Sequence, residues 1–225
     1  MNYFQIITRV LQELKYPTVA TFSNLTNPEH LQIKNLINVV NRDILLSAGY
    51  NVREKSRNFN IPANTSNYTR VYNSINGEIK RNGVIVDEEV YNLEQDISKF
   101  ITGNVDETEY CIYGQYFYFG SKNEIRTANI MYLTYNLAEN SSGVEQEELI
   151  LETDVSIIPE QLVEQILVYG TCYYYKGSNS TDARMAFWLQ QYNNGIKSLN
   201  GFNQSQDQRI EVIIPTNKNI RARIV

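Results

Sequence analysis

Residues 158–200 read IPEQLVEQILVYGTCYYYKGSNSTDARMAFWLQQYNNGIKSLN, and this stretch holds two apolar patterns with the period of an α-helix. Pro159 suits the start of the first helix, and Gly177 suits its end. The apolar positions are Leu162, Val163, Ile166, Leu167, Gly170, Tyr173 and Tyr174, then Met185, Trp188, Leu189, Tyr192, Ile196 and Leu199. Because only a short loop, residues 178–181, separates the patterns, we predict an antiparallel helical hairpin.

Two further helical patterns lie near the amino terminus. The first covers residues 3–15, and the second begins at Asn27-Pro28, a cap followed by a first helical position, and ends at Gly49. Their apolar positions are Phe4, Ile7, Val10, Leu11 and Leu14, then Ile33, Leu36, Ile37, Val40 and Ile44. Since none of the four helices buries its apolar side unaided, we predict an α+β fold with a four-helix core bundle.

Between Tyr50 and Thr153 the pattern changes to short alternating segments. The predicted strands are residues 57–61, 69–75, 79–86, 109–113, 116–119 and 125–135. Asn76-Gly77 and Asn82-Gly83 suit tight hairpin turns, because these residues tolerate positive φ. Asp87 is predicted to cap a short helix. This region is therefore expected to form an inserted small antiparallel β subdomain.

The predicted organisation has four parts. Residues 1–49 form the amino-terminal helices, 50–157 the β-rich insert with an acidic loop, 158–200 the helix pair, and 201–225 an extended tail. The tail joins a β-prone run to positive charges and has no apolar side long enough to hold it on its own subunit. We expect it to bind a partner as an added strand through Arg209, Ile210, Val212, Ile214, Lys218, Arg221 and Arg223.

Composition limits the classes of function. The 225 residues carry a net charge of −5, which gives no basic footprint for binding nucleic acid through its phosphates. No apolar run is long enough to span a membrane, and the amino terminus lacks a signal-peptide pattern, so we expect folding in a cytoplasm. The 17 tyrosines suit surfaces half buried in a partner, and a biased composition explains them equally well.

Residues for catalysis or metal binding are sparse. His30 is the only histidine, and it lies in the first turn of a predicted helix with no serine or cysteine motif to use it. Cys111 and Cys172 are expected to be free and buried. Metal-binding and phosphate-binding motifs are absent from the sequence. We therefore predict no catalytic, metal or cofactor site, and the composition favours assembly over catalysis.

The order of these features resembles a known family. A Tyr110-x-x-x-Gly114 hairpin leads to a strand ending in Tyr132-x-x-Tyr135, then come Ile158-Pro159-Glu160 and a helix with Trp188-x-x-x-Tyr192. With the two opening helices, residues 1–200 resemble the head-to-tail adaptor (connector) proteins of short-tailed phages, including the crAss-like group. The resemblance implies a structural virion protein with a helical bundle and a β subdomain. It also implies a ring, usually of twelve copies, under the portal, with the genome passing through its lumen during ejection.

This resemblance implies partners and a location. The expected partners are other copies of the chain, the portal protein, and tail or tail-hub proteins. DNA would pass through without being bound specifically, and no membrane partner is expected. The chain would be made in the host cytoplasm and located in the virion neck. Two alternatives stay open, namely another neck or tail-tube ring component and an enzyme of unrecognised type.

A run of seven carboxylates without a basic residue occupies residues 139–160. One interpretation is a solvated loop, since like charges repel one another. In a ring, carboxylates that face the lumen would instead keep DNA phosphates from adhering. The candidates for such lumen-facing residues are Glu145, Glu147, Glu148, Glu152 and Asp154.

Overall fold

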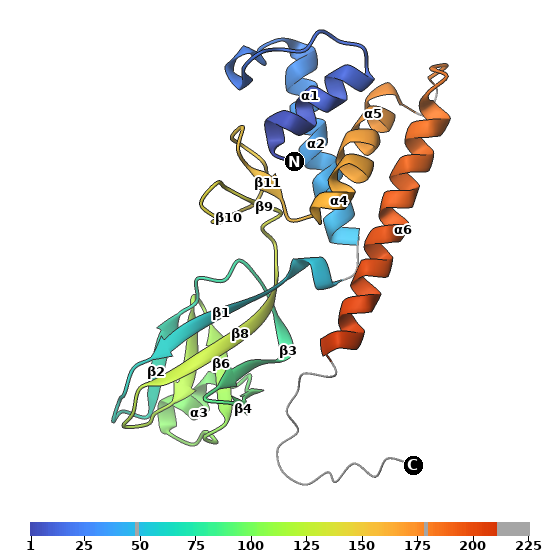
Figure 1. Ribbon diagram of the computed structural model, residues 1–225. Coiled ribbons are helices and arrows are strands. Elements are labelled where there is room, and N and C mark those ends of the chain that lie inside the picture. The colour runs from blue at the N-terminus through green and yellow to red at the C-terminus, as the bar shows by residue number, and fades with distance from the viewer. Residues whose placement is uncertain (48–49, 178–179, 211–225) are drawn as a thin grey trace, which may run out of the picture. The chain divides into compact units, whose positions relative to one another are not determined.

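The computed structural model describes residues 1–47, 50–177 and 180–210, and Figure 1 labels most of their helices and strands. The chain forms two compact units, each with its own apolar core. The helical unit comprises Met1–Val52 and the chain from Leu137 onward, and the strand unit comprises Arg53–Asn136. The predicted insert ran to residue 157, so its last part, including the acidic run, belongs to the helical unit.

The first two helices start where the sequence signals lie. Helix α1 (Tyr3–Glu13) opens with a capping box, in which Asn2 and Gln5 each accept the other's backbone N–H through a side-chain oxygen at 2.9 Å. After the 3₁₀ turn η1 (Phe22–Asn24), helix α2 (Pro28–Ser47) begins at the predicted proline. Both helices bury one side in the core of the helical unit.

The third helical segment is interrupted. Helix α4 (Glu160–Val163) passes into a π-helical turn, η3 (Glu164–Val168), and continues as α5 (Tyr169–Lys176). A π-helical turn widens the backbone and changes which side chains share a face. The segment ends at Gly177, which has a positive φ of 75°.

Helix α6 (Met185–Ile210) packs on η3 and α5. Two glycines permit the close approach. A Cβ atom at Gly170 would lie 2.7 Å from the ring of Tyr192, and one at Gly195 would lie 2.8 Å from Cγ1 of Ile166. Within the residues that the structure describes, no helix has both the length and the apolar composition to cross a membrane.

A small sheet completes the helical unit. Its strands are β9 (Ala138–Glu139), β10 (Glu145–Gln146) and β11 (Val155–Ser156), in the order β10-β9-β11. Asn41 of α2 ties this sheet down, because its amide donates to the carbonyl of Leu137 at 3.1 Å and accepts from the Ser156 hydroxyl at 2.6 Å. The sheet and its loops contribute Leu137, Ala138, Leu149 and Ile158 to the core.

The prediction of a four-helix core bundle with an extended tail is therefore wrong, and the fold is mixed. A bundle requires four long helices that cover one another, whereas the segment at residues 160–176 is interrupted and α1 has only 11 residues. The small sheet and its loops cover part of the apolar core of the helical unit, a role that the prediction gave to helices alone. Helix α6 also continues through Gly201 to Ile210, where the prediction had placed the start of the tail.

The strand unit contains two four-stranded sheets over a shared apolar core. One has the order β1-β8-β3-β4 and the other β2-β7-β6-β5. The bounds are β1 (Glu54–Ile61), β2 (Tyr68–Tyr72), β3 (Gly77–Val86), β4 (Glu89–Val90), β5 (Asn92–Leu93), β6 (Glu109–Tyr113), β7 (Tyr116–Gly120) and β8 (Arg126–Thr134). Neighbouring strands are antiparallel except for β5 and β6, and the 3₁₀ turn η2 (Tyr50–Arg53) leads into β1.

Two local predictions in this unit are wrong. Asn82-Gly83 does not turn the chain, because the pair forms an irregularity inside β3 where the register against β8 shifts. Asp87 does not cap a helix either, since it lies in the turn between β3 and β4. Helix α3 (Ile97–Thr102) is capped instead by Asp96, whose carboxylate accepts from the Ser98 N–H at 2.9 Å.

Candidate interaction surfaces

Asp154 lies within the acidic run but has no access to solvent. Its Oδ2 accepts hydrogen bonds from Nε2 of Gln146 at 2.5 Å and from the backbone N–H groups of Ile150 and Leu151 at 2.7 and 2.6 Å. These bonds close the loop between β10 and β11. A carboxylate enclosed in this way does not face a channel, so Asp154 leaves the set of candidate lumen residues.

The other carboxylates of the set lie at the surface. Glu147, Glu148 and Glu152 are exposed, and Glu145 is partly buried in β10. Oε2 of Glu148 lies 3.9 Å from Nη2 of Arg42, and an exposed pair at this distance contributes only about 0 to 1 kcal/mol. The structure thus brings acidic side chains together on one short segment and leaves most of their charge available to a partner.

A groove of about 360 Å³ lies between this segment and α2. Asn38 fixes one wall, because its amide donates to the carbonyl of Leu149 at 3.0 Å and accepts from the N–H of the same residue at 3.0 Å. The Tyr3 hydroxyl donates to the carbonyl of Lys34 at 2.9 Å. Burial raises the pKa of Tyr3, and the charges of Glu148 and Asp154 raise it further. Tyr3 is therefore a neutral, structural side chain at neutral pH.

The predicted partner-binding tail falls mostly outside the described residues. Arg209 and Ile210 belong to the last turn of α6. Val212, Ile214, Lys218, Arg221 and Arg223 lie outside the described residues.

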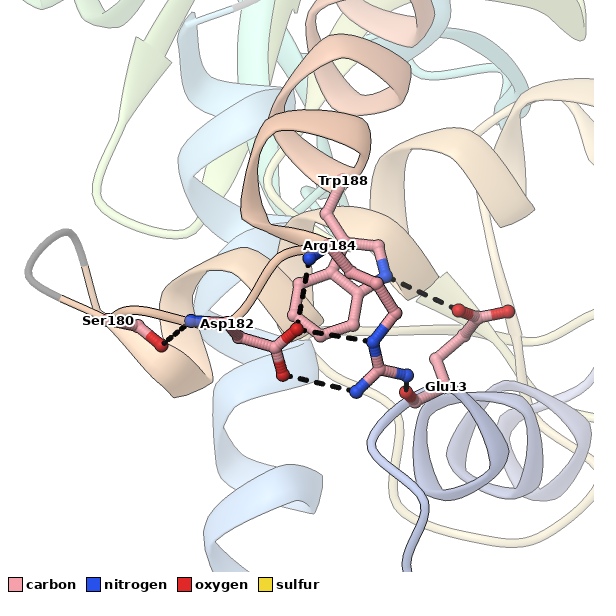
Figure 2. A network of polar contacts seen from close by, with 5 residues as sticks. All are labelled: Glu13, Ser180, Asp182, Arg184 and Trp188. Atoms are coloured by element: carbon pink, nitrogen blue, oxygen red, sulfur yellow. Dashed lines mark hydrogen bonds and ion pairs between the residues drawn. The ribbon is translucent and has the colours of Figure 1, made fainter.

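A polar network joins the end of α1 to the start of α6 (Figure 2). The guanidinium of Arg184 pairs with both oxygens of Asp182, at 3.2 and 3.1 Å, and donates to the backbone carbonyl of Glu13. Nε1 of the buried Trp188 donates to Oε2 of Glu13 at 3.3 Å, and the centre of the guanidinium lies 4.8 Å from the indole ring. The network orients the tryptophan that fills the core, which is a structural role.

The remaining side chains with acid–base or nucleophilic chemistry are His30, Cys111 and Cys172. His30 lies in the first turn of α2 and is buried. Cys111 and Cys172 are free and buried, as predicted, and burial raises the pKa of the Cys172 thiol to about 12, so it is not a nucleophile at neutral pH. Among the described residues, no three His, Cys, Asp or Glu side chains converge on a position that could hold a metal ion.

A surface that the sequence patterns did not indicate lies on the strand unit. Alternate residues of β2, β7 and β6 point into the core, and those between them form the opposite side of the sheet. We call the exposed and partly exposed residues of this side the tyrosine face, and they are Tyr68, Arg70, Tyr72, Tyr113, Tyr116 and Tyr118. Cys111, which pairs with Tyr118 in the ladder, lies on the same side of the sheet and is buried. The period of two in each strand was visible in the sequence, but the register that brings three strands together was not.

The chain was compared with protein-family models and with curated proteins. Neither comparison finds a match.

Proposed function

We propose that this chain is a structural virion protein, the head-to-tail adaptor of a short-tailed phage. The observation that carries the proposal is the order of aromatic, proline and glycine signals over residues 1–200, which resembles that family. The proposal is consistent with the described residues, among which no three His, Cys, Asp or Glu side chains lie where they could hold a metal ion. The exposed acidic segment and the tyrosine face suit contacts with protein partners.

An adaptor that surrounds DNA forms a closed ring. Rotational closure requires that one patch of each copy contact a different patch of the next, a heterologous interface. The proposal therefore includes self-association, contact with the portal on one side of the ring, and contact with a tail protein on the other. In the virion the ring would lie in the neck.

Mixing the purified chain with the portal of the same phage tests this function. We expect the two to cosediment as a complex that contains several copies of the chain. A portal that sediments alone, at concentrations where the chain is folded, contradicts the proposal. Binding to a tail protein without binding to the portal would instead favour another neck or tail-tube component.

The exposed carboxylates lead to a second prediction. Changing Glu147, Glu148 and Glu152 to lysine should leave ring formation intact and slow the ejection of the genome, because lysines in the lumen attract phosphates within about one Debye length of 8 Å. Ejection is followed by release of DNA from particles that carry the variant. The matched control changes the same residues to glutamine, which removes charge without adding attraction. Wild-type kinetics in the lysine variant would leave the segment as a solvated loop outside the channel.

A further inference from the structure

The tyrosine face has the composition of an interface and is open in part, since Tyr72 and Tyr113 are exposed while Cys111 on the same side of the sheet is buried. Its aromatic rings form two contacting pairs, Tyr68 with Tyr118 at a centroid distance of 5.4 Å and Tyr72 with Tyr116 at 5.9 Å. Tyr72 and Tyr113 remain 55% and 62% exposed. Tyrosine and arginine are enriched at protein–protein interfaces, because each side chain offers a large contact area together with a polar tip.

Arg70 supplies the positive charge of this face. It is exposed, and its guanidinium lies 4.7 Å from the centre of the Tyr116 ring. Among the residues that the structure describes, Arg70 has no ion-pair partner. An arginine held on an aromatic ring is already oriented, so it loses little freedom when it binds a carboxylate. The occupant that fits is therefore acidic and partly apolar.

The same unit presents such a surface in the turn between β3 and β4. Asp87, Glu88 and Glu89 follow one another there, and Val90 beside them is 48% exposed. Asp87 and Glu88 have positive φ of 48° and 72°, as in a two-residue hairpin turn of type I′. Asp87 Oδ1 accepts from the Thr127 N–H at 3.0 Å, which fixes the turn. We call residues 87–90 the acidic turn.

We propose that the acidic turn of one copy of this chain docks on the tyrosine face of a second copy. The carboxylate of Glu88 pairs with Arg70, and Val90 packs on the tyrosine rings. Charge complementarity favours this occupant over nucleic acid, because the chain as a whole has a net charge of −5. This inference rests on the proposed function, for which it names the contact between neighbouring copies.

The two surfaces lie on different sheets of the strand unit, the tyrosine face on β2-β7-β6 and the acidic turn at the end of β3. Each copy therefore offers one of each to its neighbours. Such a heterologous contact propagates from copy to copy and closes into a ring when the rotation permits.

A charge exchange tests the contact in the full-length chain. Arg70→Glu and Glu88→Lys should each weaken self-association, measured by sedimentation velocity alone and with portal, by at least about tenfold, because each places like charges opposite one another. An equal mixture of the two variants should regain association. In the mixture, the glutamate introduced at position 70 of one variant meets the lysine introduced at position 88 of the other, and the remaining contacts are native.

A second variant separates docking from folding. Asp87→Asn with Glu88→Gly suits a type I′ turn better than the native pair, so the thermal midpoint should rise or stay unchanged while self-association falls.

Wild-type association in all variants, or a mixture that stays dissociated, overturns the inference. So does a wild-type chain that binds single-stranded DNA through Arg70 and does not self-associate. If the variants assemble normally and still bind portal, only this contact is wrong; if the exchange succeeds but portal is not bound, only the proposed function is wrong.

Discussion

Replacing Trp188 with alanine is expected to lower the free energy of unfolding of the helical unit by about 3 to 5 kcal/mol. The indole is fully buried in the core of that unit, and its N–H donates to Glu13. Its removal leaves a cavity, and it also removes the ring beneath the Arg184 guanidinium (Figure 2). Urea denaturation followed by far-ultraviolet circular dichroism measures the loss, since the variant lacks the chain's single tryptophan as a fluorescent probe.

Trp188→Phe is the matched control. It keeps an aromatic ring in the core and removes the indole N–H, so the expected loss is smaller, about 1 to 2 kcal/mol. A stability of the alanine variant within about 1 kcal/mol of wild type would mean that the tryptophan does not fill the core.

Ile166→Ala is expected to cost about 2 to 5 kcal/mol. Ile166 lies in the π-helical turn, is fully buried, and packs against α6 where Gly195 has no side chain. The neighbouring backbone is already in close contact, so it cannot collapse easily into the space that the lost atoms leave. The same urea titration measures the effect, with tryptophan fluorescence as a second probe.

The control at this position is Ile166→Val, which removes one methylene and should cost about 0.5 to 1.5 kcal/mol. The ratio between the two losses reports how tightly this site is packed. An alanine variant with an unchanged midpoint would place Ile166 outside the core.

Local signals in the sequence predicted the ends of several elements. Proline at residue 28 marks the start of α2 because its ring restricts φ to helical values. Glycine at residue 177 marks the end of α5 because it allows a positive φ. The strand predicted at residues 109–113 has those bounds in the structure. Each of these signals acts within a few residues, so it can be read without knowledge of the tertiary fold.

The tertiary arrangement was not predictable in the same way. An apolar pattern shows that a helix buries one side but not what covers it, and here strands of two residues share that role with helices. Strands so short carry no period. The tail was expected to begin at residue 201, yet a single glycine in a helix costs only about 1 kcal/mol, and α6 continues through Gly201.

The candidate surfaces were predicted only in part. The clustering of carboxylates was visible as a run in the sequence, whereas the burial of Asp154 depends on the loop that its own hydrogen bonds close. The tyrosine face joins residues from three strands, and Arg70 lies far from Tyr113 and Tyr116 in the sequence. Only the strand register brings them together, and register is a property of the folded sheet.

The most direct test of the adaptor function is cryo-electron microscopy of the purified chain bound to the portal of the same phage. The adaptor function predicts class averages with a closed ring of identical copies on one face of the portal, joined by heterologous contacts around an opening wide enough for double-stranded DNA. A symmetric dimer as the largest assembly, with the portal face unoccupied, would contradict it.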